Sequence, residues 1–177
     1  MGFVTLVAAL LLGAPHVFEL REGTLTYALV HKLHEFSGST HALEGKALVT
    51  PEGAGRVQVR AKVASFDSGN SNRDEHMREA THEVLHPLVE LKGTFKGLAV
   101  PVAGPTTSTV DAIIELNGVK QAASIPVTLT PEGPRLRAKF TFPLSLDAFH
   151  IDRPQLLFVK VEDRMVMSGD LSFEEQK

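Results

Sequence analysis

The sequence contains no cysteine and no tryptophan among its 177 residues, and Tyr27 is its single tyrosine. Without cysteine the chain has no disulfide, no thiolate nucleophile and no cysteine-based zinc or iron–sulfur site. The scarcity of large aromatic rings argues against a platform on which sugars or nucleotide bases stack. These absences already remove several classes of enzyme and of nucleic-acid-binding protein.

Excess charge of one sign is also lacking. The net charge is -3, from 18 Lys and Arg against 21 Asp and Glu, and the basic residues are spread along the chain. Because nucleic-acid-binding domains gather positive charge in a patch, we expect no nucleic-acid partner. The sequence has no glycine-rich phosphate loop and no Gly-x-Ser-x-Gly elbow. These absences argue against a nucleotide-binding enzyme and a serine hydrolase, and we expect no cofactor.

The longest apolar run is FVTLVAALLL, at residues 3–12, and Gly13, Ala14 and Pro15 end it. Ten residues are too few to span a bilayer but suit the core of a signal peptide, so no stable membrane span is expected. We expect residues 1–17 to be a signal peptide, residues 18–177 to form one domain, and the protein to be periplasmic or secreted. No Lys or Arg precedes the run, which leaves a first core strand or helix as the alternative.

Alternation of apolar and polar residues dominates the rest of the chain and predicts β-strands with one face inward. It is clearest at residues 56–63, where aliphatic residues alternate with arginine, glutamine and lysine, and at residues 135–144. Turns such as Pro51–Gly53 and Pro131–Gly133 separate these runs. Eight or nine short strands with this spacing favour a β-sandwich or an up-and-down barrel.

One segment breaks the alternation. Residues 71–85 (SNRDEHMREATHEVL) are polar and rich in helix formers, which predicts a short helix capped by Ser71 or Asn72. Pro87 then favours an extended chain before the next strand. The sequence thus predicts an all-β domain with one short helical insertion.

The same region carries a family resemblance. Ser65–Met77 (SFDSGNSNRDEHM), with Pro87 about ten residues later, resembles the signature of the YceI-like family. Two weaker segments, Val30–Gly38 and Leu116–Leu129, are similar to the family's early strand and to one of its hairpins. The resemblance implies a lipocalin-like antiparallel β-barrel of about eight strands. It also implies a binding protein rather than an enzyme, in which a long polyisoprenoid-type lipid, or another apolar small molecule, binds in the lumen.

A small closed barrel is either filled by its own side chains or leaves a slot for one ligand. If the slot exists, its walls are the inward-facing residues of the strands. The candidate ligand-binding residues are Tyr27, Leu29, Val59, Val63, Leu91, Phe95, Ile114, Phe140 and Phe142. The alternative is a filled barrel that acts as an interaction module without a small ligand, and a homodimer is left open.

A metal-dependent enzyme built on His and Asp is the third alternative. Its possible ligands in the signature segment are Asp67, Asn70, Asn72, Asp74 and His76. Their spacing does not match a calcium-binding EF-hand loop. We expect no metal: the Asp67, Asn70 and Asn72 side chains accept backbone hydrogen bonds in a turn, while Arg73 and Asp74 fix the helix to the barrel.

Two pairs of histidines also raise the question of a metal site. His82 and His86 are four residues apart and share one face if the helix extends that far, and His31 and His34 form a second pair. Histidines scattered over a polar surface are the commoner explanation of such pairs.

Overall fold

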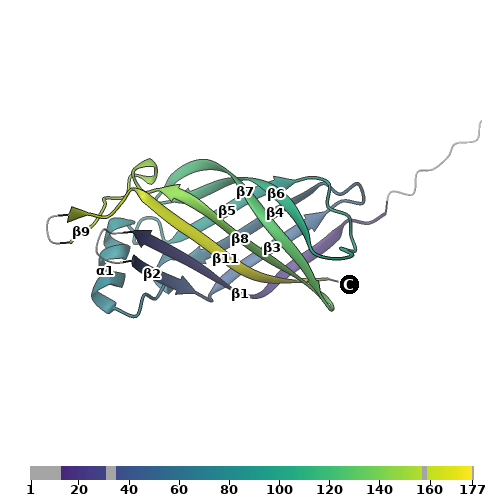
Figure 1. The fold of residues 1–177 in the computed structure, drawn as a ribbon, viewed down its shortest axis with the longest axis horizontal. Coiled ribbons are helices and arrows are strands. Elements are labelled where there is room, and N and C mark those ends of the chain that lie inside the picture. The colour runs from purple at the N-terminus through teal and green to yellow at the C-terminus, as the bar shows by residue number, and fades with distance from the viewer. Residues whose placement is uncertain (1–12, 31–34, 157–158, 177) are drawn as a thin grey trace, which may run out of the picture.

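The computed structural model describes residues 13–30, 35–156 and 159–176, which form a closed barrel of eight antiparallel strands (Figure 1). Each of these strands pairs with the next along the chain, and the last pairs with the first, which closes the sheet on itself. The barrel strands are β1 (His16–Val30), β3 (Leu43–Val49), β4 (Gly55–Lys62), β5 (Leu88–Phe95), β6 (Thr106–Leu116), β7 (Val119–Glu132), β8 (Arg135–Ser145) and β11 (Arg164–Glu175). The prediction of a lipocalin-like barrel is confirmed.

The long strand β1 closes the barrel. On one side it pairs with β11 over most of its length. On the other side its first residues pair with β3, and its last residues pair with β2 (Glu35–Thr40), in one common register. A two-stranded hairpin, β9 (Gln155–Leu156) with β10 (Val159–Lys160), lies outside the barrel sheet.

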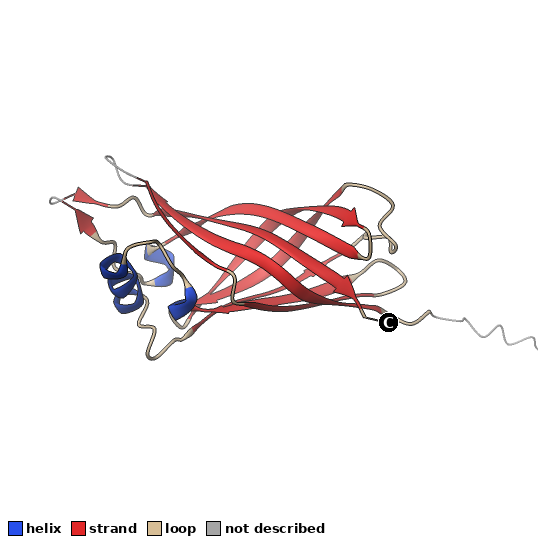
Figure 2. Ribbon diagram, turned by 90° about the horizontal axis from the view of Figure 1, so that it is seen from below, coloured by secondary structure: helices blue, strands red, loops and turns tan. Residues whose placement is uncertain are grey.

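Three helical segments gather at one end of the barrel, as Figure 2 shows. They are α1 (Ser71–Ala80) and the short 3-10 turns η1 (Val63–Ser65) and η2 (Asp147–Phe149). The helix exists as predicted, but its cap is Asn70, whose side chain accepts a hydrogen bond from the backbone N–H of Arg73 at 3.1 Å. Within the described part of the chain, no helix is long and apolar enough to cross a membrane.

The predicted alternation holds along the strands. On β4 the outward residues Arg56, Gln58, Arg60 and Lys62 are exposed, whereas Ala61 is buried. The turn at Pro51–Gly53 is also present. The second predicted turn is shifted, because residues 131 and 132 still belong to β7 and the chain reverses over residues 133–134.

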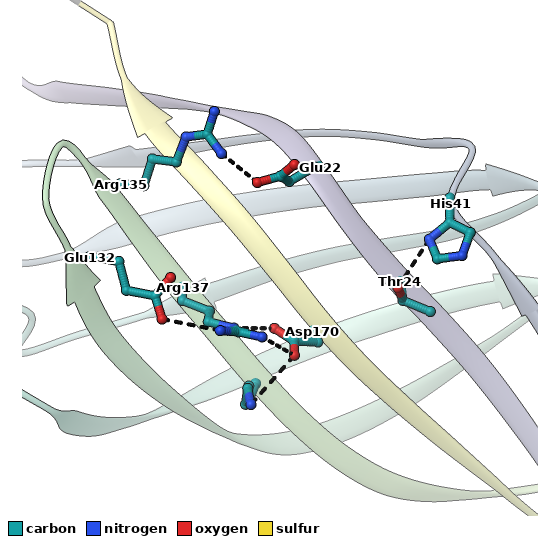
Figure 3. Close-up of polar contacts among 8 residues, drawn as sticks. Glu22, Thr24, His41, Glu132, Arg135, Arg137 and Asp170 are labelled. Atoms are coloured by element: carbon teal, nitrogen blue, oxygen red, sulfur yellow. Dashed lines mark hydrogen bonds and ion pairs between the residues drawn. The ribbon is translucent and has the colours of Figure 1, made fainter.

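Ion pairs join neighbouring strands on the outer wall (Figure 3). Arg137 on β8 donates two hydrogen bonds to the Asp170 carboxylate on β11, at 2.6 and 2.7 Å. Bonding to Arg137 holds the pKa of Asp170 below its usual value. Glu132 contacts the same guanidinium, and Lys139 lies 3.4 Å from the Asp170 carboxylate. The outer wall is thus polar and internally paired, which leaves the lumen as the distinctive surface.

Candidate functional site

The barrel encloses a cavity of about 510 Å³. Side chains from all eight barrel strands line it, and most of them are aliphatic or aromatic. This volume lies within the range of small-molecule sites, roughly 300–1,000 Å³. The lumen is therefore not filled by its own side chains, and it offers an apolar space.

All nine predicted site residues line this one cavity. They are Tyr27 and Leu29 on β1, Val59 on β4, Val63 in η1, Leu91 and Phe95 on β5, Ile114 on β6, and Phe140 and Phe142 on β8. One placement differs, because β4 ends at Lys62 and Val63 begins the 3-10 turn instead of continuing the strand. That these side chains contact a ligand stays a prediction.

The inward-facing side chains divide into two groups. Val49 and Ile125 are only 2% and 1% exposed, so they leave almost no free surface toward the cavity. Val59 and Leu91 face each other in register across β4 and β5, yet both are half-buried. Because both side chains line the cavity, we assign their exposed surface to open space inside the barrel. The middle of the lumen is where a ligand has room.

Sequence reasoning missed part of the lining. The strands β3, β7 and β11 contribute Val49, Ile125 and Met167, among others, to the cavity. The alternation of apolar and polar residues along these strands could have identified these side chains. On β11, for example, Met165 and Met167 have the alternation of an inward-facing pair. The helix residues Arg73, His76 and Met77 also line the cavity, and no pattern in that polar segment indicated that it faces the lumen.

At the α1 end the lining becomes polar. Asn70, Asn72, Arg73 and His76 line the cavity there, and Asn72 and His76 are also exposed, so the lumen reaches solvent at this end. Tyr27 also lines this cavity. Burial raises the pKa of its hydroxyl; the charge of Asp74 raises this pKa further, and the charge of Arg73 lowers it.

The opposite end is closed by apolar side chains. Phe18, Phe95 and Leu98 line the cavity there and are all buried. Leu98 is held by a hydrogen bond from its backbone N–H to the carbonyl of Gly53, at 3.0 Å. One polar group lies among them: the Ser108 hydroxyl is buried and has no hydrogen-bond partner in the described part of the chain.

The signature segment serves mainly to build the α1 end. Asp67 accepts a hydrogen bond from the N–H of Gly69 at 2.7 Å, and the buried Asp74 carboxylate accepts one from the N–H of Ser68 at 3.1 Å. The Asp67 contact is the turn contact expected from the sequence, whereas Asp74 binds the loop before the helix and not a barrel strand. Asn72 was expected to accept a backbone hydrogen bond in a turn, but it lies within α1.

His82 and His86 do not form a helical pair, although residues 82–86 have the His-Glu-x-x-His spacing that binds zinc on a helix. The helix α1 ends at Ala80, and His82 has a φ of 48°, so His82 and His86 do not share a helical face. The His82 ring instead lies 2.9 Å from the side-chain oxygen of Asn117. Among the described residues no three His, Asp or Glu side chains form a metal-binding group. His31 and His34 lie outside the described residues.

Comparison with known proteins supports the assignment of the fold. A model of the YceI-like domain matches residues 18–173. A UPF0312 protein from Azotobacter vinelandii is 32% identical over 80 residues, which span 45% of this chain and 41% of that protein. The alignment therefore covers less than half of that relative.

Two solved structures share the fold. A domain from Saccharophagus degradans, described as a polyisoprenoid binding domain implicated in plant cell wall breakdown, matches with a TM-score of 0.74 and 15% identity, over 90% of this chain and 98% of that chain. BcnA from Burkholderia cenocepacia matches with a TM-score of 0.72 and 17% identity, over 85% of this chain and 95% of that chain. At such identities the likeness concerns the fold alone.

Proposed function

This chain belongs to the YceI-like family, and from that membership and the shape of its lumen we propose that it binds one chain-like apolar ligand of polyisoprenoid type. The ligand lies inside the barrel, along its axis. The protein acts as a carrier or store of this lipid and catalyses no reaction on it.

The open apolar lumen is the observation that carries the proposal. A closed barrel without ligand function would pack its interior, since an unfilled apolar space forfeits dispersion contacts. Burial of a ligand's apolar surface in this space contributes about 25 cal/mol per Å². A long flexible chain fits a narrow lumen lined by side chains from every strand, and it needs no charged partner along its length.

We further propose that the protein works in the periplasm or outside the cell. The apolar run at residues 3–12 supports export, although it lies outside the described residues. His16–Glu19 pair with β3, so a signal cleavage that keeps β1 whole falls before His16. This refines the boundary expected from the sequence. N-terminal sequencing of the protein from its native host tests the refinement, and a mature chain that retains residues 3–12 would overturn export.

Filling the lumen tests ligand binding directly. Val59→Trp places an indole in the open middle of the cavity, and we expect the variant to stay folded but to co-purify with much less lipid than the wild type. Arg56→Trp is the matched control, because Arg56 is exposed on the outer face of the same strand. Lipid extraction followed by mass spectrometry measures the bound ligand, and circular dichroism confirms the fold.

The same experiment distinguishes ligand binding from the alternative of an interaction module. If the barrel is an interaction module with a filled interior, wild-type protein carries no lipid and Val59→Trp overpacks the core, at roughly 1–3 kcal/mol or more. An unfolded Val59→Trp variant from a lipid-free wild type would therefore contradict the proposal.

A further inference from the structure

The turn between α1 and β5 carries apolar side chains that the fold leaves in solvent. Val84 is 91% exposed and Leu85 is 74% exposed. Leu88, the first residue of β5, is exposed as well. Among the described residues the fourth exposed large apolar side chain is Ile113, on the outer wall at β6. Three of these four side chains therefore lie within residues 84–88.

Hydrogen bonds hold this turn in place. The backbone N–H groups of Leu85 and His86 both donate to the carbonyl of His82, each at 2.9 Å. The carbonyl of Pro87 accepts a hydrogen bond from the N–H of Val63 in η1, also at 2.9 Å. The apolar side chains are thus presented to solvent by a hydrogen-bonded turn, although burying them would stabilise the fold.

The turn lies at the end of the barrel where the lumen opens. The helical segments α1, η1 and η2 gather there (Figure 2). The turn is connected to η1 through Pro87, and to η2 through Asn117. The Asn117 side chain contacts the His82 ring at 2.9 Å and donates a hydrogen bond to the carbonyl of Phe149 at 3.0 Å. The exposed apolar side chains therefore lie at the end through which a ligand has access to the lumen.

The size of this surface favours a lipid bilayer over a protein partner. Three aliphatic side chains supply at most a few hundred Å², whereas a stable protein–protein interface buries about 800 Å² per partner. A bilayer needs no such area, because a few apolar side chains that enter the boundary between headgroups and acyl chains give weak, reversible binding. An apolar chain-like lipid also partitions into a bilayer rather than into water, so a carrier has to reach it there.

The charge near the turn indicates how it would bind a bilayer. Residues 71–88 contain two arginines against four acidic residues. Attraction to anionic lipid needs a cluster of Lys and Arg. The binding energy at this surface therefore comes from apolar burial and not from anionic headgroups.

We propose that Val84, Leu85 and Leu88 insert into the surface of a lipid bilayer and hold the open end of the barrel against it. The contact places the opening of the lumen where an apolar ligand passes between bilayer and protein. This inference rests on the proposed function, because ligand exchange gives the contact its use. The contact itself is measurable without any ligand.

The absence of tryptophan from the sequence provides the probe. Leu85→Trp gives the protein a single indole, whose emission shifts to shorter wavelength when it leaves water for a bilayer. Titration with phosphatidylcholine vesicles should produce this shift, half complete at about 1 mM accessible lipid, as expected for two or three aliphatic side chains. Phosphatidylglycerol in the vesicles, or salt at about 0.5 M, should change the midpoint by less than about twofold. Ile113→Trp is the matched control, and its emission should not shift.

Removal of the apolar surface tests the same contact in a second way. The double variant Val84→Ser, Leu85→Ser should lower the fraction of protein that co-sediments with vesicles at about 1 mM lipid at least fivefold. Ile113→Ser should bind like the wild type. Both variants should keep the circular dichroism spectrum and the co-purified lipid of the wild type, because none of the three positions lines the cavity.

The possible failures are distinguishable. If Leu85→Trp shows no shift, or if Ile113→Trp shifts equally, the docking surface is refuted while ligand binding in the lumen stands. Vesicle binding that requires phosphatidylglycerol would refute apolar insertion. A shift that grows with protein concentration in the absence of vesicles would show that a second copy of the chain covers the turn, and would also refute the proposal. If vesicles bind the protein but native wild-type protein carries no lipid, docking stands and the proposed function fails.

Discussion

The two ends of the lumen are built differently. At the α1 end, the segment of residues 63–81 presents Asn70, Arg73 and His76 to the cavity, beside apolar residues such as Leu146 and Ile151. The opposite end brings Phe18, Phe95 and Leu98 together from distant parts of the sequence, and all three are buried. This difference indicates that the end at Phe95 is packed for stability, whereas the α1 end is polar and open to a ligand.

Truncating one apolar side chain at each end tests this contrast with the largest effect. Phe95→Ala removes a buried ring that packs against Gly55, and we expect a loss of about 3–5 kcal/mol in the free energy of unfolding. Met77→Ala at the α1 end should cost no more than about 1.5 kcal/mol, because Met77 is only half-buried beside open space. Urea denaturation measures both, and equal losses would break the comparison.

Replacing each of two asparagines at the α1 end is a matched test, for which we expect an effect of intermediate size on stability. Asn70→Ala removes the side chain that caps α1 and should cost about 1 kcal/mol. Asn72→Ala changes the same residue type two positions later, where no cap is lost, and should shift stability by less than about 0.5 kcal/mol. Thermal unfolding followed by circular dichroism compares them. A larger loss for Asn72→Ala would show that the cap is misassigned.

Removing the buried Ser108 hydroxyl, which has no hydrogen-bond partner among the described residues, should make the protein more stable. Burying a hydroxyl without a partner costs free energy, so Ser108→Ala should raise the stability of the ligand-free protein by up to about 1 kcal/mol. Ser124→Ala on the outer face is the control and should be neutral or slightly destabilising, since its hydroxyl hydrogen-bonds the Asp111 carboxylate at 3.0 Å. Chemical denaturation measures the free energy of unfolding of both variants. A clear decrease for Ser108→Ala would contradict the prediction and indicate that the hydroxyl has a partner inside the lumen.

The outer wall between the two ends should show the smallest effect. The pKa of Asp170 is lowered in the folded state, so its pair with Arg137 stabilises the fold above the ordinary pKa of an aspartate, about 3.9. That contribution is lost as the pH falls through the lowered folded pKa. Arg137→Gln should therefore be slightly less stable than the wild type at neutral pH, and the difference should vanish in acid. A difference that persists in acid would exclude the pair as its cause.

The walls of the lumen were predictable from the sequence, whereas its polar end was only partly so. The period of two along a strand fixes which side chains point inward, so Val59, Phe140 and Phe142 could be placed at the cavity. Val63 was placed on a strand although it begins a 3-10 turn, because the same alternation continues across the boundary of β4. Element boundaries depend on tertiary contacts that no local pattern reports.

The α1 end shows the limits most clearly. The helix was predicted, but neither its cap nor the face that it turns to the lumen follows from a polar segment without apolar periodicity. His82 lies beyond the end of the helix, and its ring contacts Asn117, a residue 35 positions away. Val84 and Leu85 are 91% and 74% exposed, contrary to the usual burial of such side chains. Of these features, only the contact of His82 with Asn117 joins residues distant in sequence.

The mass of the native protein tests the central claim most directly. Wild-type protein purified from its native host under mild conditions is measured by native mass spectrometry and again after denaturation. The account predicts that the native mass exceeds the denatured mass by one chain-like lipid per barrel, and that Val59→Trp abolishes the excess. Equal native and denatured masses, both as purified and after incubation with polyprenol or polyprenyl phosphate, would contradict it.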